Sequence, residues 1–305
     1  MSDTALTEAI RAWVDEMRRT RRWRFWGRLA VFSVLALVAL SWLGEEDEGF
    51  SRSEHTALIN IKGEIGGLDG VLADDVIAAL ADVYKANHVK GIVLRINSSG
   101  GSPVHAGQIY DEIRRQKQLH PNIPLVVTVD DICASGGYYI AAAADSIFVD
   151  KASIVGSIGV VMDGFGFTGA MQKLGIERRM MTAGEHKGFL DPFLPRRPQS
   201  ERHIQAMIDE VHTQFIAAVR NGRGKRLKED ADIFSGLVWS GTRAVELGLA
   251  DGLGNLNQVA REVIGTENII DYSYRETLPE RLMRRLGTSI GTALQPWARE
   301  SAQLR

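Results

Sequence analysis

Apolar and polar positions alternate along the middle of the chain with two periods, one typical of strands and one typical of helices. Short β-forming runs predict strands at residues 57–65, 91–98, 123–131, 146–150 and 156–163. Amphipathic or alanine-rich stretches predict helices at residues 72–86, 105–118, 138–144, 200–222, 242–248 and 257–265. Strands that alternate with helices favour a mainly parallel sheet with crossover helices, so we expect one α/β unit over residues 56–265.

A long apolar stretch precedes this unit, and no charged residue occurs from residue 29 to 44. Extended back to residue 25, past Arg28, the stretch reaches about 30 Å as a helix, which matches the hydrocarbon thickness of a bilayer. Arginines cluster before it and acidic residues follow it. The positive-inside bias then makes residues 1–24 a basic cytoplasmic arm and places everything after residue 48 across the membrane. A cleavable signal peptide is the alternative, because Ala39-Leu40-Ser41 loosely matches a cleavage site.

Two further segments flank the α/β unit. Polar residues at 45–55 predict a linker after the apolar stretch. At the other end, the tail at 266–305 carries apolar residues at helical spacing, namely Leu278, Leu282, Leu286 and Ile290. Such a face suits a membrane surface or a partner subunit, and it also suits an ordinary amphipathic helix or a frayed end.

Composition and charge exclude several classes of protein. The chain has 305 residues, 45% of them apolar, with 36 Lys and Arg against 38 Asp and Glu. Its net charge of -2 lacks the basic excess of a dedicated nucleic-acid binder, so we expect no nucleic acid as a partner. The single cysteine, Cys133, cannot form an internal disulfide. No Cys and His spacing suggests structural zinc, and we expect neither a metal nor a cofactor.

Ser135 is the candidate nucleophile. It follows the strand expected at 123–131 and precedes an alanine-rich helix, so its hydroxyl would lie beside unpaired backbone N–H groups and the positive end of a helix dipole. Gly136 and Gly137 lack a Cβ, which lets a substrate carbonyl approach the backbone. A helix N-cap with glycines in a tight turn explains this segment equally well.

A second glycine pair, Gly100 and Gly101, follows the preceding strand at its carboxyl end, where open α/β sheets place their sites. The two glycine loops would then meet. The N–H groups of Gly136 and Gly101 would supply two donors for one tetrahedral oxygen. A plain turn is the alternative explanation of this pair.

A serine nucleophile needs a base, and the chain offers two kinds. His105 or His186 with an aspartate would make a triad, although nothing local supports one. Lys187 is the other candidate, and its amine would need its pKa lowered by about 2 to 3 units to serve as a base near pH 7. The apolar residues within 189–193 could desolvate it. An isolated lysine is otherwise a surface residue.

Three blocks of sequence carry a resemblance. They are RINSSGGSP at 95–103, ASGGYYIAAAAD at 134–145 followed by GSIGVV at 156–161, and AGEHKG at 183–188. In order and spacing they resemble the signal peptide peptidase SppA family of Ser-Lys membrane proteases. The similarity runs from about residue 56 to 260 and includes SGLVWSGTRAVELGLADGLG at 235–254.

The resemblance implies a ClpP/crotonase-like fold and a serine endopeptidase that cleaves remnant signal peptides. It implies one N-terminal transmembrane helix in the bacterial inner membrane, with the catalytic domain in the periplasm. It also implies an assembly of eight protomers, in which neighbouring subunits supply the serine and the lysine of one site.

Carried over by position, the resemblance makes Ser135 the nucleophile, Lys187 the general base and Ser157 the hydroxyl that orients the lysine. The oxyanion hole would consist of Gly136 and Gly101. Gly100 is the alternative to Gly101.

Two other functions fit parts of the sequence. A crotonase-like acyl-CoA enzyme shares the fold and uses glycine N–H groups, but it needs neither Ser135 nor Lys187. An extracytoplasmic domain also suits it badly, because CoA is cytosolic. The other function is that of a membrane scaffold with a silent Ser-Lys pair, and the presence of every candidate residue argues against it.

Overall fold

The computed structural model describes residues 26–29, 31–34, 36–37, 53–67, 70–228 and 232–274. The chain divides into two compact units, one of Met1–Phe50 with Arg275–Arg305 and one of Ser51–Tyr274. The second unit contains the predicted α/β domain and reaches past its expected end at residue 265.

Most of the predicted membrane span lies outside the described residues. Within 25–44, the described residues 26–29, 31–34 and 36–37 are helical and exposed. The basic arm at 1–24, residues 45–52 of the linker and residues 275–305 of the tail also lie outside the described residues. Among the residues that the structure does describe, no helix has both the length and the apolar character needed to cross a membrane.

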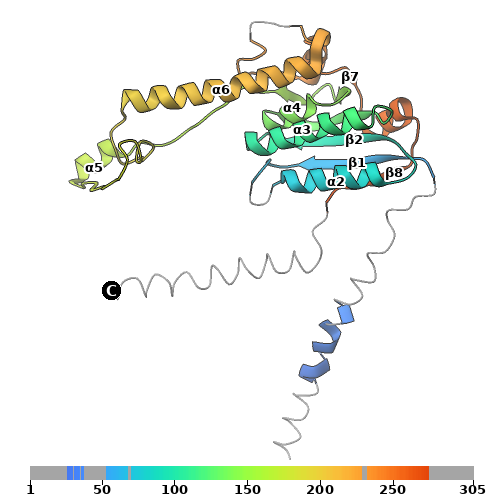
Figure 1. The fold of residues 1–305 in the computed structure, drawn as a ribbon, viewed down its shortest axis with the longest axis horizontal. Helices are drawn as coiled ribbons and strands as arrows, with labels where there is room; N and C mark the ends of the chain where they lie inside the picture. The colour runs from blue at the N-terminus through green and yellow to red at the C-terminus, as the bar shows by residue number, and fades with distance from the viewer. Residues whose placement is uncertain are drawn as a thin grey trace, which may run out of the picture. The chain divides into compact units, whose positions relative to one another are not determined.

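One sheet runs through the second unit (Figure 1). Its strands are β1 (His55–Lys62), β2 (Val89–Ser98), β3 (Leu125–Ala134), β4 (Ser146–Val149), β5 (Ile154–Gly156), β6 (Val238–Ser240), β7 (Gly252–Leu253) and β8 (Ile269–Asp271). The order is β6-β5-β3-β2-β1-β8, with β4 paired to both β3 and β7. The pairing of β5 with β6 is antiparallel, and the other pairings are parallel. The expected mainly parallel sheet is therefore confirmed.

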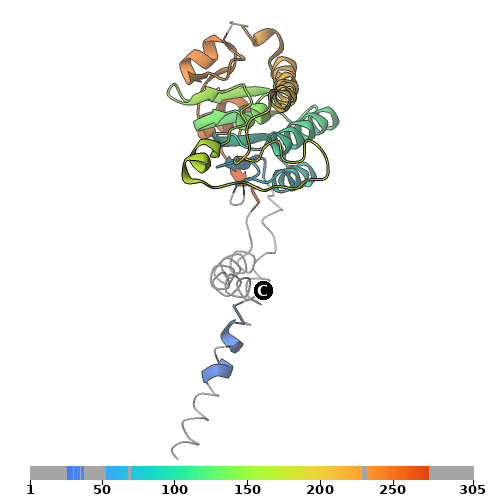
Figure 2. The same cartoon turned by 90° about the vertical axis from the view of Figure 1, so that its left-hand side faces the viewer.

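Helices connect these strands. They are α2 (Ala73–Lys85), α3 (Pro103–Leu119), α4 (Gly136–Ala141), α5 (Thr168–Leu174), α6 (Pro198–Arg223), α7 (Gly241–Glu246) and α8 (Leu256–Val259), with a 3-10 turn at Gly224–Arg226 and a π-helical turn at Ala260–Ile264. Helices α2 and α3 lie on the same side of the strands in Figure 2. Over residues 55–119 the observed order of strands and crossover helices is the order that the periodicity of the sequence predicts.

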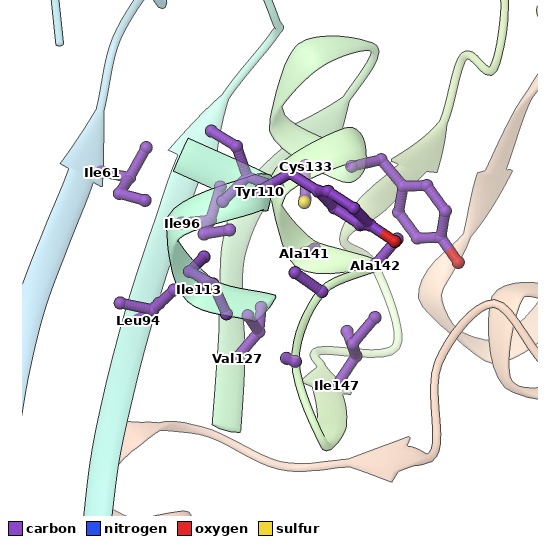
Figure 3. Packing of buried hydrophobic residues seen from close by; sticks show 14 of the residues in the cluster. Ile61, Leu94, Ile96, Tyr110, Ile113, Val127, Cys133, Ala141, Ala142 and Ile147 are labelled. Carbon is purple, nitrogen blue, oxygen red and sulfur yellow. The ribbon is translucent and has the colours of Figure 1, made fainter. Parts of the chain in front are cut away.

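Alternate side chains of the central strands enter two separate apolar clusters. The larger cluster joins the sheet to α2, α3, α4 and the C-terminal half of α6. In Figure 3, Leu94 and Ile96 of β2 and Val127 of β3 lie on the face that Tyr110 and Ile113 of α3 cover. The smaller cluster joins the opposite face to α8. Because successive strand residues point to opposite faces, helices cover both sides of the sheet.

The strand predicted at 156–163 is wrong over most of its length. Strand β5 ends at Gly156, and no strand covers residues 157–163. The backbone turns there because Gly156 has a φ of +112° and Ser157 a φ of +50°, which no extended strand adopts. Strands β6, β7 and β8 are absent from the prediction, because with only two or three residues each they show no alternation of apolar and polar positions.

A buried ion pair fixes the C-terminal end of α6 to the sheet. Arg223 is 1% exposed, and its guanidinium makes two hydrogen bonds of 2.8 and 2.9 Å to the carboxylate of Asp251. Asp251 also accepts the backbone N–H of Ile147 in β4 at 2.8 Å. Burial acts to raise the pKa of Asp251, but the hydrogen bonds and charge of Arg223 outweigh burial and hold that pKa below its ordinary value.

We expect Asp251→Asn to lower the free energy of unfolding by about 3 to 5 kcal/mol, because the substitution leaves a buried guanidinium without its carboxylate. Urea denaturation of the full chain at pH 7 measures this loss. The control is Glu246→Gln, which breaks an exposed pair with Arg243 and should cost less than about 1 kcal/mol.

The same pair should depend on pH in a defined direction. Because its carboxyl pKa is lowered by folding, the stabilisation by Asp251 is complete above the unfolded pKa of about 4 and is lost as pH falls through the folded pKa. The difference in free energy of unfolding between Asp251→Asn and the unchanged chain should therefore shrink below pH 4. If Asp251→Asn and Glu246→Gln lowered the free energy of unfolding equally at pH 7, the stabilising role of the Arg223–Asp251 pair would be contradicted.

Candidate active site

Strands β3 and β5 end side by side, and each is followed by a serine in an unusual conformation. Ala134 pairs with Gly156, and the Ser135 N–H donates to the Gly156 carbonyl at 2.9 Å. Ser135 has a φ of +51° and Ser157 a φ of +50°. For residues other than glycine, such backbone conformations cost about 1 to 3 kcal/mol and persist only where the surrounding structure enforces them.

The hydroxyl of Ser135 is not used as a helix cap. Ser135 occupies the N-cap position of α4, yet its side chain accepts no hydrogen bond from the first turn. Within the described residues its Oγ has no hydrogen-bond partner. An N-cap serine would bond to a backbone N–H of that turn, so the capping explanation of this segment is wrong.

The Gly100-Gly101 loop lies directly against Ser135. A Cβ built on Gly100 would lie 2.6 Å from Ser135 Cβ and 3.0 Å from both Ser135 Oγ and the Gly136 nitrogen. A Cβ built on Gly136 would lie 3.5 Å from the Gly101 nitrogen. The structure therefore brings together the two glycine loops that the sequence predicts to meet.

Hydrogen bonds distinguish the two amides of this loop. The Gly100 N–H donates to Ser98 Oγ at 3.2 Å, and its carbonyl accepts the Ile65 N–H at 2.9 Å. The Ser102 N–H donates to the Ile65 carbonyl at 2.8 Å. Gly101 lies between them, and its own N–H takes no part in this pairing with Ile65. The Gly101 amide is therefore the one available to a ligand.

A cavity of about 750 Å³ opens beside these groups. Ser135, Ser157, Gly101 and Gly136 all line it, together with parts of α3, α6 and residues 159–162. Its size falls within the range of small-molecule and side-chain binding pockets. Among the described residues, no group of three or more His, Cys, Asp or Glu side chains is placed to hold a metal ion.

Lys187 lies apart from the other predicted site residues. We call residues 163–197 the outlying segment. It contains α5, which Figure 1 shows at the far end of α6 from α3 and α4. Lys187 is exposed in a turn where its N–H donates to the Gly184 carbonyl at 3.1 Å, and it does not line the cavity. Its amine has no hydrogen-bond partner within the described residues.

The outlying segment has its own internal contacts. The Phe167 N–H donates to the Pro192 carbonyl at 2.8 Å, and the rings of Phe167 and Phe193 stack with centroids 5.3 Å apart. Arg178 pairs with Asp191 at 2.9 Å, and the Phe193 N–H and Arg178 lower the pKa of that carboxyl. Around this framework apolar side chains are exposed, Phe165 by 81% and Met181 by 99%. Such a surface is typical of an interaction site.

Neither histidine considered as a base reaches Ser135. The His105 ring accepts the Ala73 N–H on Nδ1 at 3.0 Å, so it caps the first turn of α2. His186 is exposed in the outlying segment, next to Lys187. Neither residue lines the cavity, so within the described residues of one chain no histidine triad forms at this serine.

The α6 wall of the cavity was not predicted as part of the site. Met207, Val211 and Phe215 recur at four-residue spacing and line the cavity. That spacing indicates one face of a helix, but it does not reveal that the face borders a serine on a distant strand.

Comparison with known families agrees with this geometry. The model of peptidase family S49 matches residues 117–268, and the model of the Clp protease family matches residues 48–155. The chain belongs to peptidase family S49. The expected SppA-type resemblance is thereby confirmed, the match to the Clp protease model agrees with the mainly parallel α/β sheet described above, and the family supports a serine peptidase.

Named relatives place this S49 chain among longer proteins. It is 27% identical over 229 residues to Protease 4 of Haemophilus influenzae, covering 73% of this chain and 36% of that protein. It is 26% identical over 214 residues to the chloroplastic serine protease SPPA of Arabidopsis thaliana, covering 67% of this chain and 31% of that protein.

A third relative has a different name. The chain is 43% identical over 186 residues to a Brucella abortus protein named Na(+)/H(+) antiporter NhaA, covering 61% of this chain and 25% of that protein. The chain thus spans only about a quarter to a third of the length of these three relatives.

We expect Gly101→Ala to slow the labelling of Ser135 by a fluorophosphonate about 100-fold, the loss typical of removing one oxyanion donor. The new Cβ would overlap the Ile65 carbonyl oxygen at a φ of +140°, so the backbone must move and carry its N–H away. Mass spectrometry of the labelled chain measures the rate. Gly254→Ala is the control, because its Cβ would meet nothing closer than 3.4 Å. Equal rates in the two variants would remove Gly101 from the site.

Proposed function

We propose that this chain is a membrane-anchored serine endopeptidase that cleaves peptides by acyl transfer at Ser135. The observation that carries the proposal is the state of this serine. Its backbone is held at positive φ, its hydroxyl has no hydrogen-bond partner within the described residues, and it lines the cavity together with Gly101 and Gly136. Membership of family S49 supports the same chemistry.

In the proposed reaction, Ser135 Oγ bonds to the scissile carbonyl carbon while its proton passes to the neutral amine of Lys187. The carbon–nitrogen bond then breaks, and Lys187 gives this proton to the leaving amine. Water next loses a proton to Lys187 and attacks the acyl carbon, and Ser135 leaves with that proton. The N–H groups of Gly101 and Gly136 stabilise the oxyanion in both steps. The bond from Gly100 N–H to Ser98 favours Gly101 over Gly100 in this role.

We infer that Lys187 acts on a neighbouring copy within a homo-octamer. Two observations support a shared site: Lys187 does not line the cavity of its own chain, and it belongs to an outlying segment whose exposed apolar surface a second copy would cover. Ser157 lines the same cavity as Ser135, which suits a hydroxyl that orients the incoming amine.

We propose apolar peptides, such as the remnants of cleaved signal peptides, as the substrates. The apolar α6 wall of Met207, Val211 and Phe215 suits them. The helix proposed at 25–44 would anchor the chain in the bacterial inner membrane, with its N-terminus in the cytoplasm and the α/β unit in the periplasm. Relatives of the SppA type support membrane association.

Alanine substitutions test the dyad. We expect Ser135→Ala and Lys187→Ala each to abolish hydrolysis of an internally quenched apolar peptide by the full assembled chain, because each removes one half of the acyl-transfer machinery. Lys173→Ala is the matched control, since Lys173 is an exposed lysine of the same outlying segment. Undiminished hydrolysis by Ser135→Ala or Lys187→Ala would end the proposal.

Mixing the two inactive chains tests whether sites are shared. Co-assembly of equal amounts of Ser135→Ala and Lys187→Ala should restore about a quarter of the native rate, because half of the serines and half of the lysines are intact and neighbours combine at random. Gel filtration checks that the mixed assembly has the native size. A mixture that stays inactive at native size would show that each chain uses its own lysine.

A further inference from the structure

The cavity beside Ser135 continues along α3 and α6, away from the serine. Gly107 and Asp111 line it from α3, Val211 and Phe215 line it from α6, and Tyr139 of α4 lies between these helices. Among the described residues that line the cavity, Asp111 is the one with a charged side chain. The cleft, which apolar and neutral polar side chains line, therefore contains a single carboxylate.

The Asp111 carboxylate is not occupied by a protein partner. It is exposed, and within the described part of the chain it forms no ion pair or hydrogen bond. The neighbouring phenol of Tyr139 is packed against Phe215, with ring centroids 4.9 Å apart. Burial, and after it the Asp111 charge, raise the pKa of Tyr139, so the phenol stays neutral and adds no competing charge. Asp111 is thus free to bind a cation.

Asp111 lies farther along α3 than Ala106, the residue of this helix that contacts the turn at Ser135 and Gly136. Gly136 follows the serine directly, and a Cβ built on it would lie 3.4 Å from Ala106 Cβ on α3. From Ala106 to Asp111, α3 advances by about 7.5 Å. Extended lysine and arginine side chains have this length scale. Their methylene groups would cross the apolar part of the cleft while the charged end reaches the carboxylate.

We propose that Asp111 determines specificity by binding the ammonium or guanidinium group of a basic substrate residue next to the cleaved bond. The inference rests on the proposed endopeptidase function and refines its substrate class. The preferred segment would be apolar with one lysine or arginine at the cut, in contrast to the purely apolar segments that the family resemblance implies.

A pair of peptides tests this proposal. Two quenched peptides differ only in lysine or norleucine before the cleaved bond, so that they share a straight stem and differ in the ammonium group. We expect the full assembled chain to cleave the lysine peptide with the higher kcat/KM. Asp111→Asn should lower the lysine-to-norleucine ratio about tenfold, the low end of what a hydrogen bond to a charged group contributes. Glu210→Gln removes the same charge from α6 without touching the cavity, so it should leave the ratio unchanged.

Charge reversal gives a second variant. Asp111→Lys should favour a glutamate peptide over the lysine peptide, which loss of folding could not produce. The proposal is overturned if the unchanged chain does not cleave the lysine peptide with the higher kcat/KM. It is also overturned if Asp111→Asn has the same lysine-to-norleucine ratio as Glu210→Gln.

A binding measurement separates this inference from the proposed function. Fluorescence anisotropy with Ser135→Ala, which can bind but not cleave, gives the affinity ratio of the two peptides. We expect tighter binding of the lysine peptide and loss of that preference when Asp111→Asn is added. If the unchanged chain cleaves neither peptide, the endopeptidase proposal fails, whereas the affinity ratio still decides the role of Asp111.

Discussion

The candidate site depends on one backbone hydrogen bond, from the Ser135 N–H to the Gly156 carbonyl at 2.9 Å. This bond extends the pairing of β3 with β5 by one residue beyond their last paired positions, and at this same residue the chain turns into α4 with a positive φ. The main chain, and not a side-chain contact, therefore positions the serine. As a consequence, the hydroxyl stays available, which a capping or packed serine would not allow.

The parallel sheet supplies the second constraint, because its strands deliver their carboxyl ends to one edge. The loop after β2 reaches Ser135 only because Gly100 has no side chain, since a Cβ there would lie 2.6 Å from Ser135 Cβ. The backbone bonds of Ile65 go to Gly100 and Ser102, so they leave the Gly101 N–H unused by this pairing. The geometry of two glycine loops and one serine thus follows from strand order, from steric exclusion and from the bond that the Gly100 N–H makes to Ser98 Oγ.

Much of this arrangement could be predicted from the sequence, and the reasons for the failures are local. The β1–α2–β2–α3–β3 region has long apolar runs with clear periodicity, and Ser135 and the glycines stand at the ends of those runs. Strands β6, β7 and β8 are too short to show a period, and the left-handed Ser157 ends a run that reads as a continuous strand. Sequence spacing could not predict the place of Lys187, because the outlying segment extends away from the sheet (Figure 1) and its position does not follow from the order of strands and helices.

The position of β1 within the sheet has a mechanical consequence for the unit. This first strand of the unit pairs with β2 on one side and β8 on the other, and His55 at its start bonds through Nε2 to the Tyr272 hydroxyl at 3.0 Å. An N-terminal strand that is paired on both sides is held more firmly than an unpaired terminus. A pull applied along the chain at residue 53 would load the ladders of β1 with β2 and of β1 with β8 in shear at the same time, so the force is spread over the sheet before it reaches the edge that carries Ser135.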